Sequence, residues 1–137
     1  MKFITKSFDL SAGEFTIELD RPCRCYVGLI EWHMPSLDSK QYTDNIVDIT
    51  CEQIDSTLDN PRRLLKRVVS SNFKWQHMTH YTPNFIDFKL VDSQDRFLTF
   101  KIKRFDGKPF SFEQSTTAHI IIGFKQLAKK EDRLVCI

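Results

Sequence analysis

The chain has 137 residues, with 20 Lys or Arg against 18 Asp or Glu, and its net charge is +2. This length suits one domain with a substantial core, and the balanced charge gives no strong reason to expect a nucleic-acid or membrane partner. Twelve phenylalanines and only three alanines favour sheet over helix, because aromatic side chains suit a pleated surface and alanine is the best helix former.

The first part of the chain predicts two strands and a third that is apolar on both sides. Residues 3–10 are expected to form a first strand or an N-terminal arm within residues 1–13. Residues 14–20 alternate apolar and polar side chains, which is the pattern of a half-buried strand. Residues 25–34 form the next strand, with Trp32 on the face opposite to Val27. A strand that is apolar on both faces is covered on both faces, or lies at an interface as well as on a core.

The remaining strands are marked by alternation and by turn residues between them. Residues 61–69 also show helical spacing, so a short helix beginning at Pro61 is the alternative for that segment. Residues 127–137 are expected to form a C-terminal tail. The strands expected after residue 45 cover 46–54, 62–69, 73–80, 85–91, 96–104 and 118–126.

This pattern predicts an all-β fold, and more narrowly a single jelly roll, an eight-stranded antiparallel β-sandwich in one domain covering 1–137. The strands from 14–20 to 118–126 supply the eight that are needed. Alternation within each strand predicts which side chains face the core. This inward set contains Phe15, Ile17, Leu19, Val27, Leu29, Ile49, Leu65, Phe88, Leu90, Phe100, Ile102, Ile120 and Ile122.

A metal site is not expected from the spacing of the possible ligands. Cys23 and Cys25 are separated by one residue, which is too close for the usual zinc knuckle. His77 and His80 would point to opposite faces of a strand. Cys51 is the remaining candidate ligand. We therefore expect no metal and no other cofactor. The three cysteines named above and Cys136 are expected to be free thiols in a reducing compartment.

No catalytic arrangement is predicted either. The chain has no recognised motif around a nucleophilic Ser or Cys, and carboxylate pairs such as Asp87 with Asp92, or Glu31 with Asp48, are common on the surfaces of β-proteins. We expect no enzymatic activity. The histidines weighed as bases are His33, His77, His80 and His119, of which His119 is expected to face solvent or a neighbouring subunit.

Two further groups of residues have a binding interpretation and a simpler one. The basic run 61–67 could contact phosphates, but solvated charges beside packed leucines fit a nearly neutral chain better. Four aromatic residues could form a sugar-stacking platform, although such residues are more often core or interface anchors. They are Trp32, Tyr42, Trp75 and Tyr81.

A series of sequence blocks resembles the minor capsid (penton) proteins of Polinton (Maverick) elements and adintovirus-like viruses. The blocks are YVGLIEWHMP at 26–35, RLLKRV at 63–68, FDGKPFSFE at 105–113 and HIIIGFK at 119–125. Together they extend the resemblance over about residues 15–125, and their order and spacing are more specific than any one block.

This resemblance implies a structural role in a virion. Five copies would form a capsomer at each vertex of an icosahedral particle, beside trimers of a double-jelly-roll major capsid protein, after synthesis inside the host cell. A host-domesticated copy, or a carbohydrate- or receptor-binding β-sandwich, is the alternative.

A pentamer needs heterologous contacts between different faces of neighbouring subunits. The strand at 25–34 has one more apolar face than a sandwich requires, and Trp and Met are enriched in interface cores. The residues expected to line the sides of the pentamer are therefore Trp32, His33 and Met34.

Overall fold

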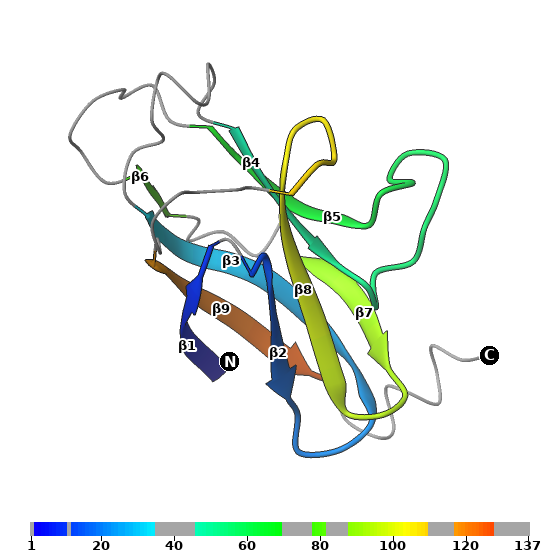
Figure 1. Ribbon diagram of the computed structural model, residues 1–137. Coiled ribbons are helices and arrows are strands. Elements are labelled where there is room, and N and C mark those ends of the chain that lie inside the picture. Colours follow the sequence, from blue (N-terminus) through cyan, green and yellow to red (C-terminus); the bar gives the residue numbers. More distant parts are fainter. Residues whose placement is uncertain are drawn as a thin grey trace, which may run out of the picture.

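The protein folds into two antiparallel β-sheets that pack face to face, as the computed structural model shows (Figure 1). The structure describes residues 2–10, 12–34, 46–69, 78–81, 88–109 and 117–127. All regular elements in these ranges are strands, in agreement with the predicted all-β class. Among the same residues no helix has the length and apolar character of a membrane span.

The first sheet has the order β1-β9-β3, with β6 and β7 both paired to the far edge of β3. β6 pairs with the end of β3 around Trp32 and β7 with its start around Cys25, so these two short strands share one edge position. The bounds of this sheet are β1 Lys2–Asp9, β9 Thr117–Gln126, β3 Cys23–Met34, β6 Met78–Tyr81 and β7 Lys89–Ser93.

The second sheet has the order β2-β8-β4-β5. Its bounds are β2 Glu14–Glu18, β8 Phe97–Arg104, β4 Ile46–Cys51 and β5 Leu64–Val69. The chain crosses repeatedly between the sheets, and with β6 and β7 counted as one position each sheet has four places. This arrangement is that of a jelly roll, as predicted.

The segment expected as a first strand or an arm is an edge strand. All eight residues of β1 pair with β9, from Lys2 opposite Phe124 to Asp9 opposite Thr117. The arm interpretation is therefore wrong, because Ile4 and Phe8 pack against the core between the sheets. At the other end of the chain, Leu127 is buried and its amide donates to the Arg24 carbonyl; residues 128–137 of the expected tail lie outside the described residues.

The segment after Pro61 is a strand and not a helix. β5 pairs antiparallel with β4, and Arg63 turns the chain into it with a φ of 55°. The helical alternative is wrong because the segment pairs along β4. Leu65 and Val68, three residues apart, are both buried because the register is irregular opposite Ile49 and Thr50.

The core between the sheets contains most of the predicted inward set. Two members, Phe88 and Leu90, are wrong. Leu90 pairs with Tyr26 on the outer face of the first sheet and is exposed. Phe88 is buried, but its ring lies on that same outer face, above Gly28 and Gly123. β7 is inward at Val91 and Ser93 instead, so the predicted alternation is right in period and wrong in face.

Candidate functional site

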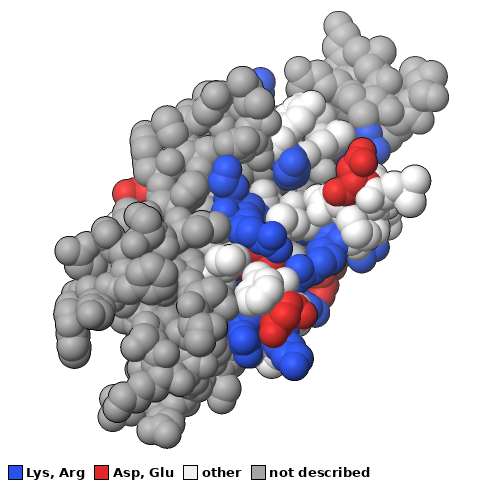
Figure 2. Space-filling model, turned by 90° about the horizontal axis from the view of Figure 1, so that it is seen from above, with Lys and Arg blue, Asp and Glu red and all other residues white. Residues whose placement is uncertain are grey.

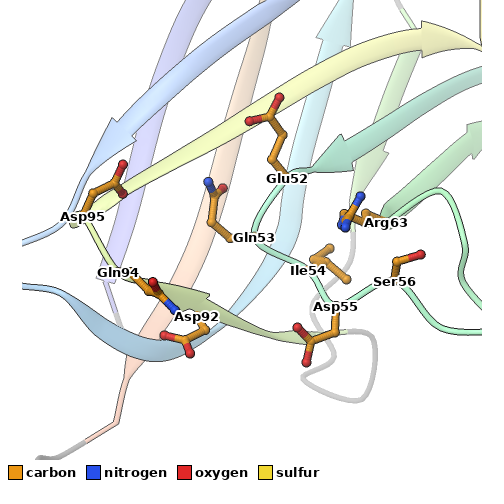
Figure 3. Close-up of a pocket in the computed structure, with 9 residues that line it drawn as sticks. All are labelled: Glu52, Gln53, Ile54, Asp55, Ser56, Arg63, Asp92, Gln94 and Asp95. Atoms are coloured by element: carbon orange, nitrogen blue, oxygen red, sulfur yellow. The ribbon is translucent and has the colours of Figure 1, made fainter.

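A pocket of about 530 Å³ lies at one end of the sandwich, where the β4–β5 connection meets the turn between β7 and β8 (Figure 3). Its lining is mainly polar and acidic. It is formed by Glu52, Gln53, Ile54, Asp55, Ser56, Arg63, Asp92, Gln94 and Asp95.

Gln53 fixes the two loops around this pocket to the sheets. Its side-chain oxygen accepts from the Thr99 amide at 2.9 Å, and its backbone carbonyl accepts from the Asp92 amide at 3.4 Å. Next to it, Ile54 forms an isolated bridge with Val91 and is buried. The pocket wall is therefore built on strands β7 and β8, although all of its residues except Asp92 come from the loops.

Two carboxylates of the pocket are already engaged with neighbours. Glu52 lies 2.7 Å from Lys101, and this contact raises the pKa of Lys101. Asp95 accepts from the Phe97 amide at 3.0 Å, which closes the turn into β8. Ser56 donates its hydroxyl to the Pro61 carbonyl. The described residues of the lining include no His, Cys or aromatic residue, so they offer neither a nucleophile–base pair nor a platform for stacking a sugar ring.

The candidate metal ligands do not meet in the described structure. Cys23, Cys25 and Cys51 form no disulfide in the described structure, and all three are buried in the core between the sheets. Among the described residues no group of three or more His, Cys, Asp or Glu is placed to hold a metal ion. His77 lies outside the described residues, as does the side chain of His80.

The candidate carboxylate pairs are not brought together either. Glu31 pairs with Ile121 in the first sheet, whereas Asp48 pairs with Arg67 and Lys103 in the second. Asp92 lines the pocket, but Asp87 lies outside the described residues.

Two histidines lie side by side on the outer face of the first sheet. His33 and His119 are register partners on β3 and β9. The His119 Nδ1 is 2.7 Å from the Ser7 hydroxyl oxygen, and the His33 Nε2 is 3.5 Å from a Glu31 carboxylate oxygen. His119 is exposed, consistent with the prediction that it faces solvent or a neighbour.

The predicted interface residue Trp32 belongs to the core. Its side chain is completely buried within the single chain, and its ring lies 6.0 Å from that of Phe8. The prediction is wrong because the register of β3 shifts between Leu29 and Glu31, so that the side chains after Ile30 change faces. His33 lies on the outer face and stays a predicted interface residue, whereas the side chain of Met34 lies outside the described residues.

The same outer face carries exposed apolar side chains. The alternating pattern had predicted one of them, Leu90, to face the core. Phe3 on β1 is 60% exposed, Tyr26 on β3 is 41% exposed and Leu90 on β7 is 37% exposed. Tyr26 and Leu90 are direct cross-strand partners, and Phe3 pairs with Gly123 of the glycine pair under Phe88. We call Phe3, Tyr26 and Leu90 the outer apolar patch.

The sugar-stacking platform is not assembled by the described residues. Trp32 is in the core, Tyr42 and Trp75 lie outside the described residues, and Tyr81 is described only as part of β6. Comparison with known proteins adds no family: the chain matches no protein-family model, and no curated protein matches it in sequence.

Proposed function

We propose that this chain is a structural subunit of a protein shell, the vertex protein that forms pentamers in an icosahedral virus-like particle. The observation that carries the proposal is the strand order, β1-β9-β3-β6 and β7 against β2-β8-β4-β5, which is that of a jelly roll. It agrees with the capsid family that the sequence blocks resemble. Because one fold hosts many functions, the proposal also needs a surface suited to assembly.

The outer apolar patch supports such a role. Large apolar side chains that stay exposed on a folded chain mark interaction surfaces more often when they are neighbours than when they are scattered. Tyr26 and Leu90 are adjacent across β3 and β7. Aromatic residues such as Tyr and Phe are also enriched in interface cores.

A closed ring requires a second, different patch, because its contacts join unlike faces. Leu58 is suited to this second contact. It is fully exposed in the β4–β5 connection, which projects on the side of the molecule away from β1 in Figure 1. In the proposed ring, Leu58 of one subunit packs on the outer apolar patch of the next, and the complete ring is placed among trimers of a double-jelly-roll major capsid protein.

The test is the mass of the protein in solution by light scattering, measured over a range of concentrations and after mixing with the major capsid protein of the same particle. We expect five times the chain mass at high concentration, and rings in negative-stain images. Tyr26→Ser with Leu90→Ser should shift the protein toward monomer without lowering its stability greatly, since both side chains are exposed.

Phe97→Ser is the matched control, because Phe97 is exposed to the same extent as Leu90 but lies on the second sheet. It should leave the mass unchanged. A protein that stays monomeric at every concentration and does not enter particles with the major capsid protein would contradict the proposed function. Equal loss of assembly in Phe97→Ser and in the patch variant would show that the outer apolar patch is not the specific contact between subunits.

A further inference from the structure

The outer face of the second sheet combines cationic and aromatic side chains along one strand. In β8 the residues Leu98, Phe100 and Ile102 are buried. The alternate positions Phe97, Thr99, Lys101 and Lys103 therefore face outward, away from the first sheet. Phe105 follows directly after the strand and is 43% exposed, while Phe97 at the opposite end is 37% exposed.

A buried carboxylate holds two arginines beside this row. Asp48 is completely buried, and Arg67 binds both of its oxygens, at 2.7 and 2.9 Å. Arg62 lies 3.3 Å from the same carboxylate. Asp48 is also the register partner of Lys103 on β8. One negative charge therefore faces two arginines and an adjacent lysine, and the surface above it is positive.

The arginine heads remain accessible. The Arg62 and Arg67 side chains are 41% and 45% exposed, although both are fixed by Asp48. Arg62 additionally donates to the Phe105 carbonyl at 3.1 Å, which places a guanidinium next to the aromatic end of the row. In the view from above, Lys and Arg outnumber Asp and Glu among the described residues and are interspersed with uncharged ones (Figure 2). Fixed cations lose little side-chain entropy when an anion binds.

Acidic residues near the row are exposed and weakly held. Glu52 pairs with Lys101, and the exposed Glu14 on β2 is the register partner of the same lysine. Glu18 pairs with Arg96, whose guanidinium lies 5.7 Å above the Phe97 ring. Such surface ion pairs contribute only about 0–1 kcal/mol, so a polyanion can replace the carboxylate. Lys103 has no ion-pair partner among the described residues.

The spacing of these groups fits a flexible phosphate chain. Alternate residues on a strand lie about 6.8 Å apart, and Arg67 and Lys103, on strands two apart, are separated by roughly 10 Å. Proteins that bind single-stranded nucleic acid without sequence preference use such cationic tracks together with exposed aromatic rings on which bases stack. A duplex hides its base faces, and an acidic polypeptide has none to stack.

From this arrangement we infer that the face formed by Arg62, Arg67, Phe97, Lys101, Lys103 and Phe105 binds single-stranded nucleic acid through its phosphates and stacked bases, without sequence preference. We call it the basic–aromatic face. It lies on the second sheet, opposite to the outer apolar patch, so its binding does not depend on the proposed ring.

The test is fluorescence anisotropy with a labelled oligothymidylate of about 20 nucleotides. If three of the four cations of this face each neutralise one phosphate, log affinity should fall against log salt with a slope of roughly −2. This slope corresponds to about a 15-fold loss of affinity between 50 and 200 mM NaCl. Lys103→Gln should weaken binding and make the slope shallower by about 0.7. Phe105→Ala should weaken binding about fivefold with an unchanged slope, because it removes stacking and no charge.

Lys89→Gln is the matched control, since Lys89 is an exposed lysine on β7 of the first sheet. It should bind like the parent protein. Phe105 and Lys89 are exposed and Lys103 is half-buried, and circular dichroism establishes that each variant is folded. Equal binding by the parent, Lys103→Gln and Phe105→Ala would overturn the inference. So would polyglutamate that competes as well as oligothymidylate at equal charge, because the face would then be a general anion surface suited to an acidic protein.

Discussion

A Cβ atom on Gly28 would occupy the space taken by the Phe88 ring on the outer face of the first sheet. Gly28 is paired across the strands with Gly123, so two residues without side chains lie next to each other on β3 and β9. Phe88 covers this gap, and the Ile30 side chain lies close to the Gly123 position. Burial of Phe88 outside the main core is thus a consequence of the glycine pair.

The first prediction concerns Gly28→Ala. Its new methyl group would overlap three ring atoms of Phe88, so the ring must leave its site or the strand must move. We expect the free energy of unfolding to fall by about 1–3 kcal/mol, measured by urea denaturation. Gly123→Ala should cost less, because its nearest neighbours, at 3.0 to 3.2 Å, are the ends of side chains that can shift.

The cause of that loss is checked by a double variant. If the clash with Phe88 is responsible, Phe88→Leu should reduce the cost of Gly28→Ala, because a smaller side chain leaves room for the methyl group. The two substitutions would then be non-additive, as expected for residues in contact. Additive losses would show that Gly28 is needed for another reason.

Strand alternation predicts the fold well where the pairing is regular. In β2 the inward residues Phe15 and Ile17 face Phe100 and Leu98 of β8 across an uninterrupted register, and the alternating pattern identifies them correctly. In β3 the same reasoning fails after Ile30, because an irregularity in register changes the faces of all later side chains. Nothing in the local sequence around Trp32 indicates this shift.

Phe88 shows a second limit of the sequence. Its position in the alternation is shared with Leu90, and both residues are outward. The two-residue alternation therefore places Phe88 and Leu90 correctly on one face. It does not say whether that face is the inner one, since apolar residues lie on both faces of β7. The signal that could have decided it is the absence of side chains at Gly28 and Gly123, which creates a place for an aromatic ring outside the core.

The pocket was not predicted because its parts are far apart in the chain. Gln53 and Asp92 meet only through the pairing of β7 with β3 and of β8 with β4. The basic run 61–67, in contrast, is recognisable in the sequence. Its contact with Asp48 is not, because the two segments meet only in the folded sheet. Which charges are fixed, and which remain exposed, follows from the register of β4 with β5.

The second prediction concerns the indole of Trp32. It is completely buried, and its Nε1–H has no hydrogen-bond partner among the described residues. Trp32→Ala should lower the free energy of unfolding by about 3–5 kcal/mol, because it leaves a large cavity. Trp32→Phe should cost clearly less, since it keeps most of the packing and removes an unpaired buried donor.

The Trp32→Phe variant also tests whether Trp32 belongs to the core or to an interface between subunits. The side chain does not reach the surface, so Trp32→Phe should leave the oligomeric mass and the incorporation into particles unchanged. Loss of assembly in a Trp32→Phe protein of near-parental stability would show that Trp32 contributes to the interface between subunits. The measurements are urea denaturation and light scattering on the same samples.

The third prediction concerns the ion pair of Asp48 with Arg67. Arg67→Met leaves a fully buried carboxylate with Arg62 as its remaining cation at 3.3 Å. Removing one partner of a fully buried pair typically costs about 3–5 kcal/mol. We expect less here, about 1–3 kcal/mol, because the Arg67 side chain is 45% exposed and Arg62 stays. Asp48→Leu combined with Arg67→Met should cost less than Arg67→Met alone, since no buried charge is then left uncompensated. A double variant less stable than Arg67→Met would contradict this account, and urea denaturation of the three proteins decides it.

The last prediction concerns the pH dependence that Cys51 gives to stability. Burial raises the pKa of the Cys51 thiol from its ordinary value of 9.0 to about 11. The folded state therefore favours the neutral thiol, whereas the unfolded chain ionises near its ordinary value. The resulting stabilisation is fully present below pH 9 and is lost as the pH rises toward 11.

Cys51→Ala isolates this contribution, because every other titrating group is the same in both proteins. Between about pH 8 and pH 10.5 the parent should lose roughly 2 kcal/mol more of its free energy of unfolding than the variant. The thiol should also resist alkylation in the folded protein, since the thiolate is the reactive form and is disfavoured by burial. The same loss of stability in both proteins across this range, or rapid alkylation of Cys51 at neutral pH without unfolding, would show that the thiol is accessible to solvent and not held within the core.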